Sequence, residues 1–322
     1  MKMNAVLTGL ILVCVHTSVA ALDDRTNLQL NTRMSATMSA PQPMLDYAAM
    51  PELSAQSVLV FDQATGKALM AKNAALQTPI ASITKLMTAI VVMDAGESLD
   101  ERITITSDDR DTLKGTGSRL AIGSNYTRGQ LLHLALIASD NRAAHALGRT
   151  TKGGLDRFVA NMNRMARALH MSNTVYVEPT GLSSDNVSTA LDLTKLVDYA
   201  FQNYPEIRHI STTGNYTLGT QRVVLKKKNN RTVQYRQVAF NNTNRFTRAD
   251  DWHVGLSKTG FINEAGHCLV MQAQVAERDV IIVLLDAKGT SRRAGDAALI
   301  KQWLESAQLR DSETRFIPAS RT

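Results

Sequence analysis

The sequence predicts an α/β (α+β) fold in which an antiparallel sheet is flanked by helices. Strand-like apolar runs bounded by turn residues come first, helical periodicity fills the middle of the chain, and further strand-like runs precede a terminal amphipathic helix. Because a sheet must bury its apolar faces, we expect the first hairpin and the last three strands to form one sheet with helices on both sides. A chain of 322 residues, 44% of them hydrophobic, is long enough to bury such a core.

The first predicted elements are a hairpin and a helix. Residues 57–61 form a strand-like run, residues 64–67 carry a turn signal, and residues 68–70 are expected to form the second strand of the hairpin. After Pro79, apolar residues recur at three- and four-residue spacing, which predicts a helix from Ser82 onward. Further helices are expected over residues 128–137, 142–147, 154–169 and 189–201.

Strand signals return after residue 210. The continuous apolar run at residues 280–285 is typical of a strand buried on both faces. A last amphipathic helix is expected over residues 293–308. The other strands are expected around residues 215–225, 232–240, 253–259 and 267–275.

The N-terminus has the layout of a secretory signal peptide. Lys2 gives a positive start, an apolar stretch follows, and small residues end at Ala21. The apolar stretch is too short to span a bilayer, so we expect cleavage and export. The expected organisation is a signal peptide over 1–21, a flexible leader over 22–45, one folded domain over 46–308 and a short polar tail over 309–322.

Composition limits the partners. The formal net charge of +7 favours anionic partners, and nucleic acid is not expected for an exported protein. The one dense basic run, residues 226–231, is expected to be a solvated loop or strand tip.

Signal cleavage would leave a single thiol, Cys268, whose apolar neighbours predict a buried, inert side chain. The tail lacks an apolar face, so no stable membrane anchor is expected.

Ser82 and Lys85 form the first motif that can carry chemistry. Residues three apart share one face of a helix, which sets an amine beside a hydroxyl at the helix start. A serine is a weak nucleophile until a base takes its proton, and burial can keep a lysine neutral enough to do so. Such pairs also occur by chance on exposed faces. This spacing occurs once in the chain, however, and in an apolar helix.

The second motif is Ser139-Asp140-Asn141, which follows an apolar helix. An identical triplet at residues 184–186 lies in a polar loop and is expected to be a loop cap. The third motif is Lys258-Thr259-Gly260 on a strand, where a lysine adds positive charge and a glycine lets a substrate backbone approach. Each triplet alone is weak, and their combination in this order is far more specific.

In that combination the chain resembles the penicillin-recognising serine enzymes, which comprise the D,D-peptidases and the serine β-lactamases. The resemblance covers residues 46–307 and is strongest to the periplasmic D,D-endopeptidases among them. It implies a β-lactamase/transpeptidase-like fold with an all-helical subdomain. It also extends beyond the triplets to the stretches 79–89, 177–182, 256–261 and 265–271.

The resemblance implies roles for the motif residues. Ser82 would attack the D-alanyl carbonyl and become acylated, Lys85 would be its base, and Ser139 would relay a proton to the leaving amine. The substrates would be the cross-linked muropeptides of peptidoglycan in the periplasm, and β-lactam antibiotics would be covalent inhibitors. No cofactor or metal is implied. Substrate binding would fall to Asn141, Lys258, Thr259 and Gly260, and the backbone N–H groups of Ser82 and Phe261 would hold the oxyanion.

Four alternatives remain open on sequence. A D-alanyl-D-alanine carboxypeptidase would share every motif, since no triplet encodes which bond is cut. A β-lactamase would need a deacylating glutamate in a Glu-x-x-Leu-Asn pattern, and the stretch at Glu178 departs from it, so Glu178 is expected to be structural. A penicillin sensor would keep the pocket without turnover. For a metal peptidase, no His-Glu-x-x-His motif occurs, and His133 and His145 are expected to be packing residues.

Overall fold

The computed structural model describes residues 50–227 and 230–315. The predicted signal peptide and leader therefore lie outside the described residues. None of the helices within those two ranges is both long and apolar enough to cross a bilayer.

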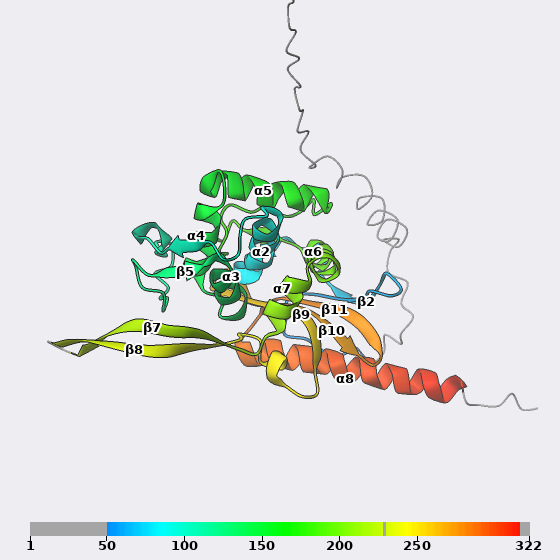
Figure 1. Ribbon diagram of the computed structural model, residues 1–322. Coiled ribbons are helices and arrows are strands. Elements are labelled where there is room, and N and C mark those ends of the chain that lie inside the picture. The colour runs from blue at the N-terminus through cyan, green and yellow to red at the C-terminus, as the bar shows by residue number, and fades with distance from the viewer. Residues whose placement is uncertain (1–49, 228–229, 316–322) are drawn as a thin grey trace, which may run out of the picture.

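The centre of the molecule is a five-stranded antiparallel sheet in the order β2-β1-β11-β10-β9 (Figure 1). The first hairpin pairs with the last three strands, as predicted, because β1 lies beside β11 with Leu59 opposite Val283. The apolar run of β11 is buried on both faces of the sheet. The strands are β1 (Ser57–Asp62), β2 (Lys67–Lys72), β9 (His253–Ile262), β10 (Gly266–Val275) and β11 (Arg278–Ala287).

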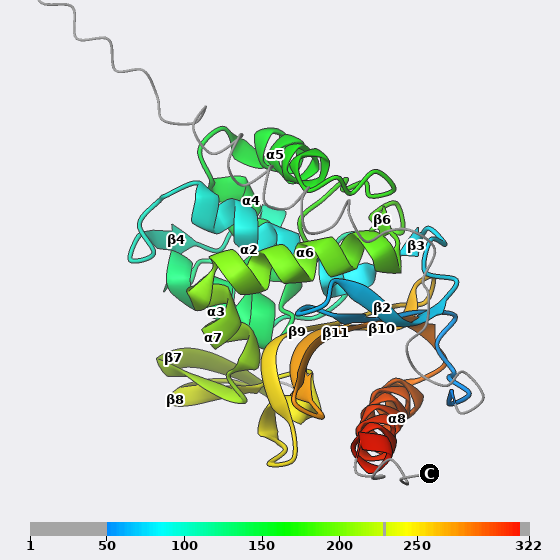
Figure 2. The ribbon, with the colours of Figure 1, turned by 90° about the vertical axis from the view of Figure 1, so that its right-hand side faces the viewer.

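Helices cover both faces of this sheet (Figure 2). On one face α6 (Ala190–Asn203) packs against β1, β10 and β11, and on the other α8 (Thr290–Arg315) packs against β10 and β11. Each face has its own hydrophobic cluster. The last helix extends seven residues past its predicted end at residue 308, because neither proline nor glycine interrupts the sequence before Pro318.

A helical region stands on the α6 side of the sheet (Figures 1 and 2). The Thr127 hydroxyl accepts a hydrogen bond from Gln130 N and so caps α3, which spans the predicted residues. Asp140 caps α4 through Ala143 N. The helices here are the 3-10 turns η2 (Ala81–Ile83) and η3 (Ser107–Asp109), and α2 (Thr84–Asp94), α3 (Arg128–Ile137), α4 (Asn141–Thr150) and α5 (Gly154–Ala168).

Several short elements escaped prediction from the sequence. Helix α7 (Pro205–Thr212) has only eight residues, starts with a proline and follows α6 almost directly. The paired strands β3 and β6 have two residues each, too few to show a period of two. The remaining short elements are β3 (Thr78–Pro79), β4 (Arg102–Thr104), β5 (Asn125–Thr127), β6 (Val187–Ser188) and η4 (Arg245–Arg248).

A long two-stranded ribbon projects from the body of the molecule (Figure 1). It consists of β7 (Asn215–Lys227) and β8 (Asn230–Asn241). The backbone register ends with Lys227 opposite Asn230, so the described residues of the basic run lie at a strand tip, as predicted. At its base, Tyr216 stacks on His133 of α3 with ring centroids 4.6 Å apart.

Candidate active site

Ser82 and Lys85 meet where η2 runs into α2. Ser82 is half-buried, Lys85 is fully buried, and the Lys85 Nζ lies 2.8 Å from the Ser82 Oγ. The predicted pair is therefore formed by consecutive turns within the core, where its neighbours Ile83 and Leu86 are buried.

Two further oxygens complete the surroundings of Lys85. Its Nζ donates to Asn141 Oδ1 at 2.6 Å and to the backbone carbonyl of Thr180 at 2.6 Å. A neutral amine has two N–H bonds and one lone pair. When these two acceptors take both N–H bonds, the lone pair is left for the hydroxyl hydrogen of Ser82.

The environment of Lys85 favours its neutral form. Burial lowers its pKa from the ordinary 10.5 to about 8, although the carboxylates of Glu178, Asp140 and Asp111 act in the opposite direction. A base whose pKa lies near neutrality is suited to general-base chemistry.

Ser139 lies in the turn between α3 and α4. Its backbone is left-handed, with φ of 56°, a conformation that costs a non-glycine residue free energy and is concentrated at functional sites. The buried Lys258 Nζ of β9 donates to its Oγ at 2.9 Å. Burial lowers the pKa of Lys258 well below its usual range, with further lowering by the positive charges of Lys85 and Arg293. The second and third motifs therefore meet at this contact.

The strand β9 lies directly against η2, the turn that carries Ser82. A Cβ atom added to Gly260 would lie 2.9 Å from the Ile80 carbonyl oxygen and 3.1 Å from the Ser82 nitrogen. The Thr259 Oγ1 donates to Thr243 Oγ1 at 2.6 Å. The next residue, Phe261, is half exposed and stacks on His267. The structure thus brings Ser82, Lys85 and Asn141 into contact, joins Ser139 to Lys258, and sets Gly260 of β9 against the backbone of Ser82.

The loop after Pro179 contributes residues that the motifs did not single out. Gly181 has φ of +82°, and a Cβ there would overlap the Ala81 carbonyl. Ala81 is itself left-handed, with φ of 47°. Thr180 supplies a backbone oxygen to Lys85, and a backbone acceptor leaves no signature in a sequence. In the sequence, only the family resemblance of residues 177–182 pointed to this loop, and the three motifs did not indicate that it contacts Lys85.

The second Ser-Asp-Asn triplet is structural, as predicted. Asn186 is fully buried, its Oδ1 accepts from Val177 N at 2.7 Å, and its Nδ2 donates to Glu178 Oε1 at 2.7 Å. Glu178 also accepts from Thr180 N at 2.7 Å and Gly181 N at 2.6 Å. Asn186 and Glu178 therefore hold the loop that contacts Lys85, which agrees with the structural role expected for Glu178.

The histidines considered for other chemistry have structural partners. The Nδ1 of His133 contacts the Gly129 carbonyl at 2.8 Å, and that of His145 contacts Asp109 Oδ1 at 2.9 Å. Within residues 50–227 and 230–315, no group of three or more His, Cys, Asp or Glu side chains is arranged to hold a metal ion. Cys268 is buried, as predicted, and burial raises its pKa to about 11.

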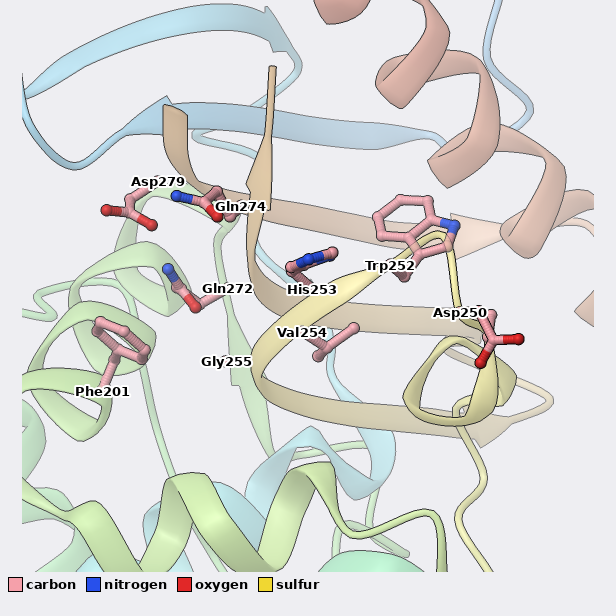
Figure 3. A pocket seen from close by; sticks show the side chains of 10 residues that line it. Phe201, Asp250, Trp252, His253, Val254, Gly255, Gln272, Gln274 and Asp279 are labelled. Atoms are coloured by element: carbon pink, nitrogen blue, oxygen red, sulfur yellow. The ribbon is translucent and has the colours of Figure 1, made fainter. Parts of the chain in front are cut away.

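A separate open pocket of about 560 Å³ lies at the opposite end of β9 (Figure 3). His253, Val254 and Gly255 begin β9 there, whereas Lys258 and Gly260 belong to its second half. None of the predicted site residues lines this pocket, so it is not the site of the expected chemistry.

The family is decided by a comparison with protein-family models. Residues 44–289 match the model described as D-alanyl-D-alanine carboxypeptidase, peptidase family S11. The chain belongs to the D-alanyl-D-alanine carboxypeptidase family. This confirms the predicted membership of the serine D,D-peptidases among the penicillin-recognising enzymes.

Curated relatives refine the position of the chain within the D-alanyl-D-alanine carboxypeptidase family. A D-alanyl-D-alanine endopeptidase of Pseudomonas aeruginosa is 43% identical over 275 residues, which cover 85% of each chain. Its counterpart in Escherichia coli is 40% identical, with 86% of this chain and 87% of the relative covered. A D-alanyl-D-alanine carboxypeptidase of Streptomyces is 30% identical and covers 79% of this chain and 88% of its own length.

Solved structures confirm the predicted transpeptidase-like fold. The Streptomyces K15 DD-transpeptidase superposes with a TM-score of 0.70 at 28% identity, covering 80% of this chain and 99% of the other. Penicillin-binding protein D2 of Listeria monocytogenes, solved in its cefotaxime-bound form, gives a TM-score of 0.66 at 27% identity with the same coverage.

Proposed function

We propose that this member of the family is a serine D,D-endopeptidase that hydrolyses D-alanyl cross-links in peptidoglycan through an acyl-enzyme on Ser82. The observation that carries the proposal is the environment of Lys85, whose buried amine has two fixed acceptors and Ser82 Oγ at 2.8 Å. The names of the two relatives at 43% and 40% identity support endopeptidase action.

Acylation begins with neutral Lys85. Its lone pair takes the Ser82 hydroxyl hydrogen while the Oγ forms a bond to the D-alanyl carbonyl carbon. The carbonyl oxygen becomes an oxyanion, and the backbone N–H groups of Ser82 and Phe261 are the proposed donors. Gly260 supports this role, because its lack of a side chain keeps β9 close to the nucleophile's turn.

Collapse of the tetrahedral intermediate needs a proton on the leaving amine. Ser139 donates its hydroxyl hydrogen to that nitrogen as the C–N bond breaks, and the proton that Lys85 took from Ser82 replaces it, directly or through Lys258, which leaves Lys85 neutral again. The contact of 2.9 Å between Lys258 Nζ and Ser139 Oγ supports this relay.

Hydrolysis completes the cycle. Water attacks the ester carbon, Lys85 accepts its proton, and the C–O bond breaks so that Ser82 regains its hydrogen. Lys258 and Thr259 bind the carboxylate of the leaving side, and Asn141 orders Lys85 and the substrate. Penicillins acylate Ser82 by the same first step. The N-terminal signal pattern supports a periplasmic location for this activity.

The test is the incubation of purified mature protein with a cross-linked muropeptide dimer and, separately, with a pentapeptide monomer. Cleavage of the dimer by the parent and its loss in Ser82→Ala are expected. A Ser82→Ala variant that cuts as well as the parent, or a parent that cuts neither substrate, would refute the proposal.

A D-alanyl-D-alanine carboxypeptidase is the second candidate, since the matching family model carries that description. The same pair of substrates separates the two activities. Cleavage of the dimer without release of terminal D-alanine from the monomer supports the endopeptidase, and the reverse result supports the carboxypeptidase.

A further inference from the structure

We propose that Asp111 and Thr116 are positioning residues that fix the side-chain amide of Asn141, so that its oxygen rather than its nitrogen faces Lys85. This inference rests on the proposed function, because it concerns the readiness of Lys85 to act as a base. Both residues lie between η3 and β5, outside the three motifs.

A chain of hydrogen bonds runs from Asp111 to the base. The Thr116 Oγ1 donates to Asp111 Oδ2 at 2.6 Å, the Asn141 Nδ2 donates to Thr116 Oγ1 at 2.9 Å, and the Lys85 Nζ donates to Asn141 Oδ1 at 2.6 Å. Asp111 is held in turn by the backbone, because Leu113 N and Lys114 N donate to its Oδ1 at 2.8 Å and 2.9 Å.

The direction of every bond in this chain follows from the carboxylate. An ionised aspartate has no hydrogen to donate, so the Thr116 hydroxyl must point its hydrogen at Asp111. The Thr116 oxygen is then an acceptor toward Asn141, which turns the NH₂ group away from Lys85. Burial raises the pKa of Asp111, but the hydrogen bonds from Lys114, Thr116 and Leu113 together lower it below its ordinary value and so favour the carboxylate.

The opposite orientation of Asn141 would disable the base. An NH₂ group facing Lys85 would donate to the lone pair of the neutral amine, which could then no longer accept the Ser82 hydrogen. It would also repel a protonated amine and so favour the neutral form. Loss of the hydrogen bond from Asn141 Nδ2 to Thr116 Oγ1 should therefore slow acylation and at the same time lower the pKa of Lys85.

The charged groups near Lys85 allow this effect to be separated from simple electrostatics. The carboxylates of Glu178, Asp140 and Asp111 raise the pKa of Lys85, and Lys258 on β9 is coupled to it by charge repulsion. Thr116→Val leaves all of these groups unchanged. Asp111→Asn removes one charge and replaces a pure acceptor by an NH₂ group that would turn the Thr116 hydroxyl around.

The experiment measures the rate of Ser82 acylation by benzylpenicillin as a function of pH. Thr116→Val should lose about tenfold in acylation rate, the effect of one neutral hydrogen bond. The midpoint of its pH profile, where the rate reaches half its maximum as Lys85 loses its proton, should move to lower pH. Thr116→Ser, which keeps the hydroxyl, should restore both. Asp111→Asn should lose rate with a larger downward shift of the midpoint.

The matched control is Thr104→Val, which removes another exposed threonine–asparagine bond, 2.6 Å from Thr104 Oγ1 to Asn125 Oδ1, away from the site. It should keep the parent rate and midpoint. The inference is overturned if Thr116→Val equals the parent, if Thr116→Ser is as slow as Thr116→Val, or if the rate falls without movement of the midpoint. A parent that benzylpenicillin fails to acylate would overturn the proposed function as well.

Discussion

At Lys85, burial and the surrounding carboxylates act on the amine in opposite directions. Burial has the larger effect, so the pKa falls to about 8 rather than rising as it would in an exposed ion pair. The two fixed acceptors, Asn141 and Thr180, then decide where the lone pair points. The surroundings thus lower the pH at which the amine becomes neutral, and its two acceptors direct its lone pair.

This balance predicts the pH dependence of acylation. Protonated Lys85 cannot accept a hydrogen from Ser82, so the rate should rise as pH increases through the pKa, with a midpoint near 8. Benzylpenicillin acylation followed from about pH 6 to about pH 10 measures it. A rate that falls over this range would contradict the assignment of Lys85, and Ser82→Ala provides the blank.

The three motifs predicted most residues of this site from the sequence, and only the structure revealed the contacts of Thr116 and of the Thr180 carbonyl. The Ser82–Lys85 spacing was informative because i and i+3 positions share a helix face. The contributions of Thr116 and the Thr180 carbonyl were hidden, because they depend on loop paths that bring distant residues together. The choice between the two Ser-Asp-Asn triplets rested on local context, and the hydrogen bonds of Asn186 support it.

Among the elements, the loop of residues 178–186 packs against the backbone of Ala81 and Ser82. Gly181 faces the Ala81 carbonyl so closely that no side chain fits between them. Gly181→Ala should therefore displace the peptide that precedes Ser82, and displacements of about 1 Å cost roughly a hundredfold in rate. The measurement is the acylation rate of the folded variant with benzylpenicillin.

Gly154→Ala is the matched control for that substitution. Gly154 also has a positive φ, +73°, but a Cβ there meets nothing within 4 Å. Both variants should lose about 1–2 kcal/mol of stability from the left-handed backbone. Only Gly181→Ala should lose acylation, and equal rates in the two variants would rule out the supporting role of Gly181.

Element prediction succeeded where periodicity was long and failed where elements were short. The α3 helix and β11 were predicted because each shows a sustained apolar pattern, and β2 was predicted because a turn signal follows β1. Helix α7 and the small strand pairs β3–β6 and β4–β5 depend on tertiary contacts instead. The end of α8 was placed too early, because a loss of apolar pattern does not by itself stop a helix.

For the whole molecule, Asp296 of α8 joins the last helix to the segment before β1. Its carboxylate accepts from Ser54 N at 3.0 Å, Ser54 Oγ at 2.8 Å and Ala55 N at 2.8 Å. Asp296→Ala would leave the half-buried donors of Ser54 and the buried Ala55 N unpaired, and it should lower the free energy of unfolding by about 2–4 kcal/mol. Urea denaturation measures this change.

Glu305→Ala on the same helix is the control. Glu305 is exposed and pairs with Lys301 at 3.5 Å, a surface contact worth less than about 1 kcal/mol. Equal stability of the two variants would show that the hydrogen bonds between Asp296 and residues 54–55 do not stabilise the fold.

The position of β1 inside the sheet has a consequence for biosynthesis. Its partner β11 leaves the ribosome long after β1 does, since Ser57 pairs with Leu285. Until then β1 and β2 form only an isolated hairpin, which is marginally stable in water. Pairing across such a sequence distance is also slow. A nascent chain built in this order can complete its central sheet only after β9, β10 and β11 have all been synthesised.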